Sequence, residues 1–222
     1  MKVLLIGGLG SIGRRYQAIL RAFDVEFEIY DVHNQFTPLR KLSFDKALVC
    51  TPTESHYSYC MELIHMGKPF LCEKPLSRDL YECTQIRDEA QKTGVVGNIV
   101  CNYKFLLEKL EGYHKQGQYH FTYDYFNTGK EGTFWDCCQL VYLDPKCTIK
   151  ISSPVWLLSI NTGFVNYQDL ELSYVFMIQQ WLAGSTDLWT LEDGVKMTEA
   201  VLGRINEEPN IHTGEKPLVS LT

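Results

Sequence analysis

The fold is decided by residues 2–15, which read KVLLIGGLGSIGRR. The apolar run over residues 2–7 indicates a buried strand, and from Ser11 to Phe23 apolar residues recur at helical spacing. Alternating apolar residues over 25–30 then predict a second strand, which ends at Asp31. A strand, a helix and a strand within about thirty residues form a βαβ unit, whose two strands must be parallel.

The alternation of strands and helices continues as far as residue 101. We expect further strands over 47–50, 69–73 and 95–101, and helices over 54–66 and 79–92. Gly94 follows the second of these helices and suits the left-handed conformation that ends many helices. The alternation predicts a doubly wound α/β fold, a dinucleotide-binding Rossmann domain with a parallel sheet at residues 1–101.

The pattern changes in residues 102–222. A helix-compatible stretch over 103–115 is followed by candidate strands over 119–127, 147–152, 155–160 and 163–167. Two helices close the chain, over 169–183 and from Thr190 to about 206, and Thr190 with Asp193 forms a capping box for the last one. We predict a shortened α+β domain with a mixed or antiparallel sheet, for substrate binding and oligomerisation.

Composition and charge exclude several classes of protein. Hydrophobic residues make up 45% of the 222 residues and charged residues 22%, which is typical of a globular protein. The net charge of −6 disfavours nucleic-acid binding, and no apolar run is long enough to span a membrane. The apolar stretch at the N-terminus is too short for an export signal, and the eight cysteines contain no C-x-x-C pair. We expect a cytoplasmic protein with buried thiols and no metal site.

The glycines of residues 8–13 follow the G-x-G-x-x-G pattern between a strand and a helix. Gly8 would permit the tight turn, Gly10 the close approach of a pyrophosphate, and Gly13 the packing of helix on strand. The free N–H groups and the dipole of the helix N-terminus favour phosphate. Asp31 can accept hydrogen bonds from the ribose hydroxyls and would repel a 2′-phosphate, so NAD(H) is expected over NADP(H). The alternative is a glycine-rich turn without a ligand.

Two further motifs carry a family resemblance. Residues 49–56 read VCTPTESH and residues 67–77 read GKPFLCEKPLS. Here the chain resembles a short form of the glucose-fructose oxidoreductase / inositol dehydrogenase / MocA (GFO/IDH/MocA) family, whose members carry T-P-x-x-x-H and E-K-P signatures. Thr51-Pro52 with His56 and Glu73-Lys74-Pro75 match them. The resemblance covers residues 2–105 closely and resumes more loosely over 169–206.

The resemblance implies the residues of the site. Lys74 would lie beside the nicotinamide, where it moves a substrate proton or orients the substrate, and the Lys74-Pro75 bond is often cis in the family. A lysine suits acid–base work if burial lowers its pKa towards neutrality. Substrate would enter near Asn102, Lys104, Asp136 and Gln139. The full set of expected cofactor-binding residues is Gly8, Gly10, Ser11, Ile12, Gly13, Asp31, Thr51, Pro52, Thr53, His56, Glu73, Lys74 and Asn102.

One family motif is incomplete. Members carry D-x-x-x-H on a helix of the second domain, and residues 132–140 are the best match. Asp136 fits the aspartate, but Leu140 stands where the histidine belongs, and the nearest polar residue, Gln139, cannot take a proton. The catalytic candidates are therefore Lys74, Asp136 and Gln139. Lys74 acts alone, or His120 or Tyr142 contributes, or the chemistry is not sugar oxidation.

These features predict an NAD(H)-dependent oxidoreductase that acts on a carbinol or carbonyl of a sugar, sugar nucleotide or cyclitol-like substrate. The alternatives are a non-catalytic dinucleotide-binding sensor or scaffold, and a reductase of a biliverdin-like or dihydrodiol-like substrate. Aromatic and apolar residues over 119–126 and 155–158 predict a homodimer through the C-terminal sheet. The tail over 207–222 is the other candidate to cover that face.

Overall fold

The computed structural model describes residues 1–31, 37–109, 121–124, 129–144, 147–150, 157–160, 163–165 and 167–207. Its N-terminal part is a five-stranded parallel sheet in the order β2-β1-β3-β4-β5. The strands are β1 (Lys2–Ile6), β2 (Glu26–Tyr30), β3 (Lys46–Val49), β4 (Phe70–Cys72) and β5 (Gly97–Ile99). The chain leaves β1 towards β2 on one side and returns to β3 on the other, so the strand order reverses between β1 and β3. Ligands of open α/β sheets bind at such a switch point.

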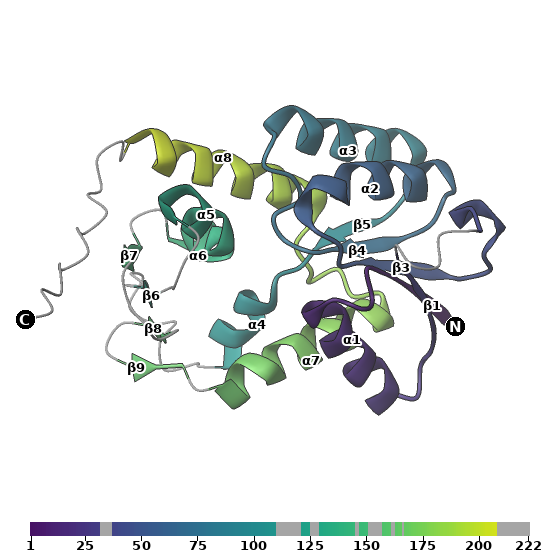
Figure 1. Ribbon diagram of the computed structural model, residues 1–222, viewed down its shortest axis with the longest axis horizontal. Coiled ribbons are helices and arrows are strands. Elements are labelled where there is room, and N and C mark those ends of the chain that lie inside the picture. The colour runs from purple at the N-terminus through teal and green to yellow at the C-terminus, as the bar shows by residue number, and fades with distance from the viewer. Residues whose placement is uncertain are drawn as a thin grey trace, which may run out of the picture.

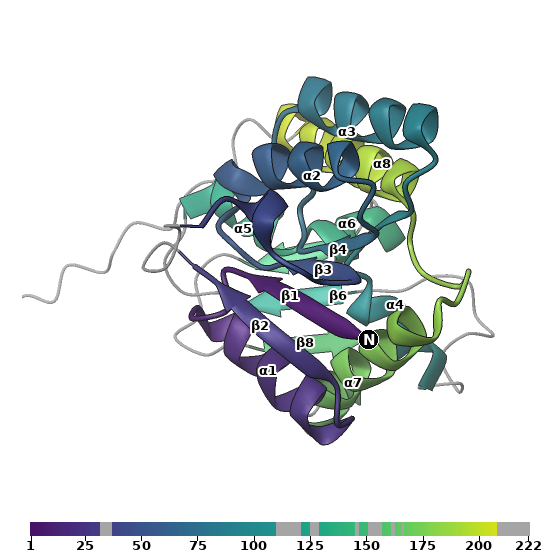
Figure 2. The same ribbon diagram turned by 90° about the vertical axis from the view of Figure 1, so that its right-hand side faces the viewer.

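Helices cover both faces of this sheet. The helices within the N-terminal part are α1 (Ser11–Ala22), α2 (His56–His65) and α3 (Leu80–Thr93), with short 3-10 turns η1 (Leu39–Lys41) and η2 (Thr53–Ser55). Figures 1 and 2 show α2 and α3 over one face, with α8 (Leu191–Glu207) beside α3. The opposite face carries α1 and α7 (Tyr167–Ala183). The α/β fold predicted from the sequence is thereby confirmed.

The strand sequences explain why both faces must be covered. All four residues of β1 from Val3 to Ile6 have no exposed surface, and neither do Ala47, Leu48 and Val49 of β3. Side chains alternate between the two faces of a strand, so an unbroken apolar run buries both faces. On α1 the buried side chains Tyr16, Ile19 and Leu20 lie on one helical stripe that packs on the sheet.

The chain between the first sheet and α7 contains shorter elements. The helices are α4 (Asn102–Lys109), α5 (Gly129–Asp136) and α6 (Cys138–Leu143). Strands β6 (Phe121–Asp124), β7 (Thr148–Lys150), β8 (Leu157–Ile160) and β9 (Gly163–Phe164) pair in the order β7-β6-β8-β9. β6 and β7 are parallel, and the β6–β8 and β8–β9 pairs are antiparallel. The side chains of the strand residues from which we predicted a dimer lie outside the described part of the chain.

Two helix ends match the sequence predictions. Gly94 follows α3 with a φ of 72°, and its N–H bonds to the carbonyl of Ala90. Before α8, the backbone N–H of Thr190 donates to the Asp193 carboxylate at 2.7 Å, and the Asp193 N–H donates to the Thr190 hydroxyl at 3.3 Å. The capping box is therefore present.

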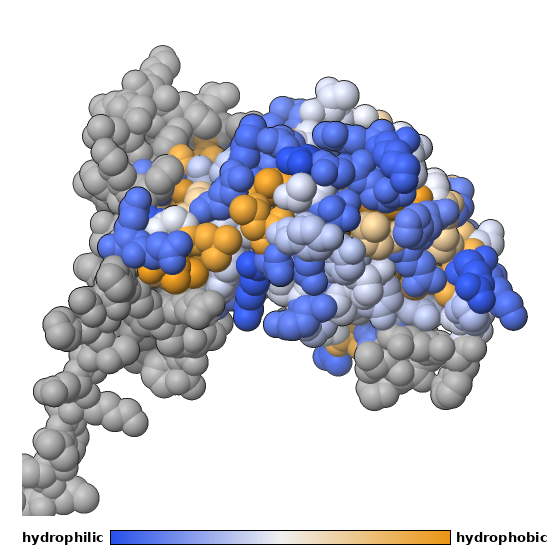
Figure 3. Space-filling view, turned by 90° about the horizontal axis from the view of Figure 1, so that it is seen from above, coloured by the Kyte–Doolittle hydropathy of each residue, from blue (hydrophilic) through white to orange (hydrophobic). Residues whose placement is uncertain are grey.

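Polar residues dominate the surface visible in Figure 3, and the cysteines lie inside the molecule. Seen from the side of α2, α3 and α8, hydrophilic residues cover most of the coloured surface (Figure 3). Among the described helices, none combines the length and hydropathy needed to cross a membrane. All eight cysteines are buried free thiols, as the sequence predicted.

Candidate active site

The turn after β1 has the shape that a dinucleotide requires. Gly7 has a φ of 84°, and a Cβ there would lie 2.7 Å from the backbone nitrogen of Thr51. A Cβ on Gly13 would lie 2.5 Å from the carbonyl oxygen of Gly8, so only glycine allows α1 to pack this closely on the turn. The sequence pattern predicts that Gly8 permits the tight turn. The structure moves the left-handed residue to Gly7, and Gly8 is instead required because a Cβ would lie 2.8 Å from Ile29.

The start of α1 suits an anionic group. No side chain caps the helix at Gly10, and the first turn, which includes Ser11 and Ile12, contains no acidic residue. Both statements hold for the described residues. A Cβ on Gly10 would meet only a backbone oxygen at 3.6 Å, so the surface above this glycine is open. Free N–H groups at an uncapped N-terminus attract phosphate, and the residues present therefore fit a pyrophosphate.

Asp31 lies at the end of β2, beside this turn. Its carboxylate accepts a hydrogen bond from the Leu9 N–H at 3.0 Å, which ties the glycine turn to the second strand. A cavity of 280 Å³ opens here at the carboxyl ends of the strands. It is lined by Gly7, Gly10, Tyr30, Asp31, Cys50, Thr51, Pro52 and Tyr59. This cavity has the position expected for the adenosine end of a dinucleotide.

His56 connects the two family motifs. Its ring is 1% exposed, and its two nitrogens lie 2.9 Å from the carbonyl oxygens of Thr51 and Pro75. The buried imidazole therefore links the segment after β3 to the segment after β4. Thr53 faces a different hollow, which it shares with Glu54 and Arg78. Neither His56 nor Thr53 lines the cavity beside Asp31.

Glu73 holds the backbone of the second motif. The carboxylate is 7% exposed and accepts hydrogen bonds from the Tyr16 hydroxyl and from the Lys74 N–H, the latter at 3.1 Å. Burial, and then the Glu73 carboxylate, raise the pKa of Tyr16 far above its ordinary value, so its hydroxyl remains a donor. The Lys74-Pro75 bond is cis, as the resemblance implied. Glu73 thus fixes the backbone of Lys74 by accepting the hydrogen bond from its N–H.

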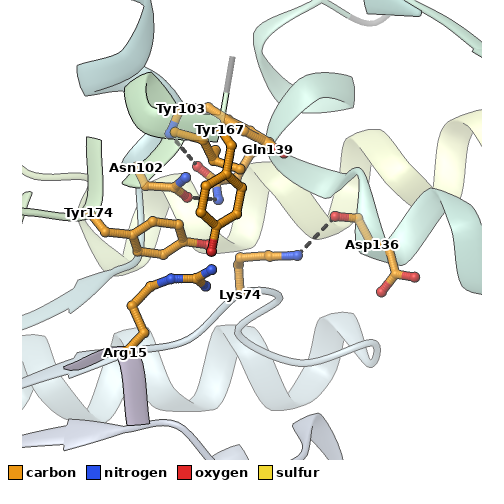
Figure 4. A pocket seen from close by; sticks show the side chains of 9 residues that line it. Arg15, Lys74, Asn102, Tyr103, Asp136, Gln139, Tyr167 and Tyr174 are labelled. Carbon is orange, nitrogen blue, oxygen red and sulfur yellow. Dashed lines mark hydrogen bonds between the residues drawn. The ribbon is translucent and has the colours of Figure 1, made fainter. Parts of the chain in front are cut away.

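A second cavity, of 250 Å³, contains the side chain of Lys74 (Figure 4). Its wall comes from five helices and the segment after β4, which are far apart in the sequence. The lining residues are Arg15, Lys74, Asn102, Tyr103, Asp136, Gln139, Tyr167, Leu170 and Tyr174. All three predicted catalytic residues and Asn102 are therefore brought together.

Lys74 is held as an ammonium. Its Nζ donates a hydrogen bond of 2.9 Å to the backbone carbonyl of Asp136, whose carboxylate points away in Figure 4. Burial by itself lowers the pKa of Lys74, but nearby Cys138 and Tyr174 and the carboxylates of Glu73 and Asp136 outweigh it, and the net shift is upward. The condition under which the lysine would suit acid–base work, a pKa lowered towards neutrality, is therefore not met. The Cys138 thiol and the Tyr174 phenol are uncharged at neutral pH, where only the carboxylates act on the ammonium.

Gln139 and Asn102 form a buried amide pair. The Gln139 Nε2 donates to the Asn102 Oδ1 at 2.7 Å, and the Gln139 Oε1 accepts from the Tyr103 N–H at 3.2 Å. Asn102 in turn donates to the Ser173 hydroxyl at 3.4 Å. Each amide is about 1% exposed, and the pair joins α4, α6 and α7 beneath the cavity. Gln139 is therefore placed to support the wall as well as to line it.

Several residues lie elsewhere than expected. Lys104 bonds to Asp187 and does not line the cavity. Tyr142 donates to Asp193 at 2.7 Å and packs edge-on against Trp189, also away from the cavity. His120 lies outside the described residues. Leu140 is 1% exposed and belongs to the core.

Five residues of the cavity wall were not predicted from the sequence: Arg15, Tyr103, Tyr167, Leu170 and Tyr174. In the sequence, Leu170 and Tyr174 lie on the apolar stripe of the helix predicted over 169–183, and Tyr167 ends the candidate strand over 163–167. Tyr103 begins a helix-compatible stretch to which the sequence assigns no role. Arg15 follows the glycine motif directly, which was a usable signal. The Arg15 side chain bonds to Glu171 on α7 through Nε at 3.0 Å and NH2 at 2.7 Å. This ion pair joins α1 to α7 across one side of the cavity.

Comparison with known proteins agrees with this geometry. Residues 6–100 match the family described as "Oxidoreductase family, NAD-binding Rossmann fold" (GFO_IDH_MocA). The match covers 95 of the 222 residues. This part of the chain therefore has the NAD-binding Rossmann fold of that oxidoreductase family. Among curated proteins no match was found.

Solved structures share the fold along most of the chain. A probable dehydrogenase from Thermotoga maritima is 15% identical with a TM-score of 0.72, and covers 94% of this chain and 97% of its own. A Gfo/Idh/MocA family oxidoreductase from Vibrio cholerae is 15% identical with a TM-score of 0.70, at 94% and 99% coverage. The WlbA (WbpB) dehydrogenase from Thermus thermophilus, in complex with NAD and UDP-GlcNAcA, is 14% identical with a TM-score of 0.65, at 92% and 94% coverage.

Proposed function

We propose that this chain transfers hydride between NAD(H) and a carbinol or carbonyl carbon of a sugar, sugar nucleotide or cyclitol-like substrate. The observation that carries the proposal is the Lys74 ammonium in the wall of a 250 Å³ cavity, on a segment that follows a strand of the parallel sheet. Similarity in fold to a dehydrogenase whose structure holds NAD and UDP-GlcNAcA supports the substrate class.

The dinucleotide would lie along the carboxyl ends of β1, β2 and β3. Its pyrophosphate would bind the N–H groups at the start of α1, above Gly10, and its adenosine ribose would meet Asp31 in the 280 Å³ cavity. The Asp31 carboxylate would repel a 2′-phosphate, so we propose a preference for NAD(H) over NADP(H). When bound, the nicotinamide supplies the site that accepts or donates hydride.

Lys74 would orient the reacting oxygen of the substrate. An ammonium has three N–H donors, and the carbonyl of Asp136 uses one of them. The remaining donors can hold a carbonyl or hydroxyl oxygen and stabilise the negative charge that develops on it. Asp136 acts through its backbone, and Gln139 can donate a further hydrogen bond from the same wall.

A substrate panel tests this function. Purified protein is mixed with NADH and candidate ketones, or with NAD+ and the matching alcohols, and the absorbance of reduced nicotinamide is followed. Turnover of a sugar or sugar nucleotide supports the proposal. Turnover of a bilin or dihydrodiol only would replace the substrate class. Tight NADH binding without turnover of any compound would favour a non-catalytic dinucleotide-binding protein.

We further propose that the chain divides near residue 101, where β5 has ended at Ile99 and α4 begins at Asn102. The last two helices of the second part pack against the first part. Helix α8 packs on α3, and Lys46 of β3 donates a hydrogen bond of 3.0 Å to the carbonyl of Trp181 in α7.

Association through the sheet β7-β6-β8-β9 remains our proposal for the assembly. Light scattering at micromolar concentration tests it, and a species of 25.6 kDa would contradict the dimer. The free thiols favour the cytoplasm.

A further inference from the structure

We propose that the hydroxyl of Tyr174 is the proton-transferring group of this site and works as a pair with Lys74. This inference rests on the proposed hydride transfer. It assigns to α7 a role that the family motif would place at residue 140, where this chain has leucine.

Tyr174 lines the cavity from α7. Its ring lies between Tyr16 and Arg15, with 6.1 Å between the two tyrosine ring centroids and 4.6 Å from the Arg15 guanidinium carbon to the Tyr174 centroid. The residue is 7% exposed, and Figure 4 shows its hydroxyl directed towards the space beside Lys74. Within the described residues no hydrogen bond to this hydroxyl is found, although the ring is firmly packed. Because Tyr174 lines the cavity, a molecule bound there could be the hydrogen-bond partner of this hydroxyl.

The electrostatic surroundings suit a phenol that must give up a proton briefly. Burial raises the pKa of Tyr174 to about 12, and the carboxylates of Glu73 and Glu171 add to the rise, whereas Lys74 and Arg15 lower it. The phenol is therefore protonated at neutral pH and can donate. The Lys74 ammonium and the Arg15 guanidinium would stabilise the phenolate left behind.

Other groups in the cavity are less suited to proton transfer. Gln139 and Asn102 are amides bonded to each other, and an amide cannot take a proton. Asp136 turns its carboxylate away from Lys74. Arg15 is always charged and is held by Glu171. Tyr167 also lines the cavity, but it is 66% exposed, so water competes for its hydroxyl.

The proton balance of the step is complete. In the reduction, the substrate C=O becomes a C–O single bond as hydride brings both electrons from NADH to carbon, and the Tyr174 O–H bond breaks to give its proton to the oxygen. The products are NAD+, the alcohol and a phenolate, which regains a proton from solvent. In the oxidation the same bonds change in reverse. The phenolate form is then required, so oxidation should accelerate as the pH rises and reduction should slow.

The variant Tyr174→Phe tests the role because it removes only the hydroxyl and keeps the ring against Tyr16 and Arg15. With a substrate identified by the panel, we expect kcat to fall by about a hundredfold or more, the usual scale of acid–base catalysis. NADH affinity, measured by fluorescence titration, should stay unchanged. The change of the oxidation and reduction rates with alkaline pH should disappear. Loss of packing alone would not remove this pH dependence. Tyr81→Phe, on the exposed face of α3, is the matched control.

A second measurement needs no substrate. Tyrosinate absorbance is recorded after an alkaline pH jump, before unfolding, for the unmodified chain, Tyr174→Phe and Lys74→Met. We expect one ionisation to vanish in Tyr174→Phe and the same ionisation to move to higher pH in Lys74→Met. An unchanged ionisation in Lys74→Met would show that the two groups are not paired and would overturn the proposal. Retained kcat in Tyr174→Phe would overturn it as well, while the proposed function would stand. Absence of turnover in the unmodified chain would refute the proposed function and with it the catalytic role.

Discussion

Lys74 donates its hydrogen bond to the backbone carbonyl of Asp136, at 2.9 Å, while the carboxylate of that residue points away from the ammonium. The main chain at the end of α5 therefore holds the lysine, and the identity of side chain 136 matters less than its motif suggests. This arrangement separates two variants that the family resemblance would treat alike.

Lys74→Met should reduce turnover by about a hundredfold or more, because the group that orients and polarises the substrate oxygen is lost. Asp136→Asn should cost much less, because its carbonyl remains in place. Steady-state kinetics with the same substrate compares the two, and Lys92→Met on the surface of α3 is the control. Equal losses in the Lys74 and Asp136 variants would show that the carboxylate takes part after all.

Asp31→Ser should change the cofactor preference. A hydrogen bond to a charged group contributes about 1.5–3 kcal/mol, so NAD(H) affinity should fall by about tenfold to a hundredfold. Affinity for NADP(H) should rise, because the charge that repels its 2′-phosphate is gone. Fluorescence titration with NADH and NADPH measures both, and Asp24→Asn, in the turn between α1 and β2, serves as control. An unmodified chain that binds NADPH as tightly as NADH would contradict the role of Asp31.

Local patterns in the sequence were sufficient for the first sheet and its helices. The glycines over 7–13, the apolar run of β1 and the position of Gly94 each restrict the backbone through neighbours in the chain. Such restrictions can be recognised in the sequence without knowledge of the tertiary contacts. The capping box of Thr190 and Asp193 is equally local, and it too was predicted.

The side of the candidate site that α1 and α7 form could not be predicted in this way. Tyr174 and Arg15 are 159 positions apart and meet because α7 returns to pack beside α1. The helical stripe on α7 shows that Tyr174 is buried, but not that its hydroxyl reaches a cavity. The raised pKa of Lys74 likewise depends on groups from three separate parts of the chain, Cys138, Tyr174 and the carboxylates of Glu73 and Asp136, whereas burial alone would lower it.

The thiols should be unreactive in the folded chain. All eight cysteines are buried, and burial raises the pKa of Cys138 to about 11 and that of Cys83 to about 11. Because the thiolate is the reacting form, labelling by a disulfide reagent at neutral pH should be negligible in the native protein and should reach eight groups in denaturant. Absorbance of the released thiolate measures both. Rapid labelling of one group in the native state would show that its burial is incomplete.

Two alanine variants of glycine should act in opposite directions. Gly13→Ala places a Cβ 2.5 Å from the Gly8 carbonyl, so it should distort the glycine turn and weaken both NADH binding and stability. Gly203→Ala lies in α8, where a Cβ meets nothing within 4 Å, and should raise the free energy of unfolding by up to about 1 kcal/mol. Urea unfolding with and without NADH compares them. Normal NADH affinity in Gly13→Ala would mean that α1 can move away from the turn without harm.

The cap of α8 should make stability depend on pH. Burial tends to raise the pKa of Asp193, but hydrogen bonds from Tyr142 and Thr190 prevail and lower it below its ordinary 3.8. A carboxyl with a depressed pKa in the folded state stabilises the protein above the unfolded-state value, and that contribution is lost as the pH falls through the folded-state value. Asp193→Asn should therefore cost about 1 kcal/mol at neutral pH, the usual contribution of a helix cap, and much less below pH 3.8. Urea unfolding at both pH values measures the difference, with Glu199→Gln on the exposed side of α8 as control. A cost that is the same at both pH values would show that the Asp193 charge does not stabilise the cap.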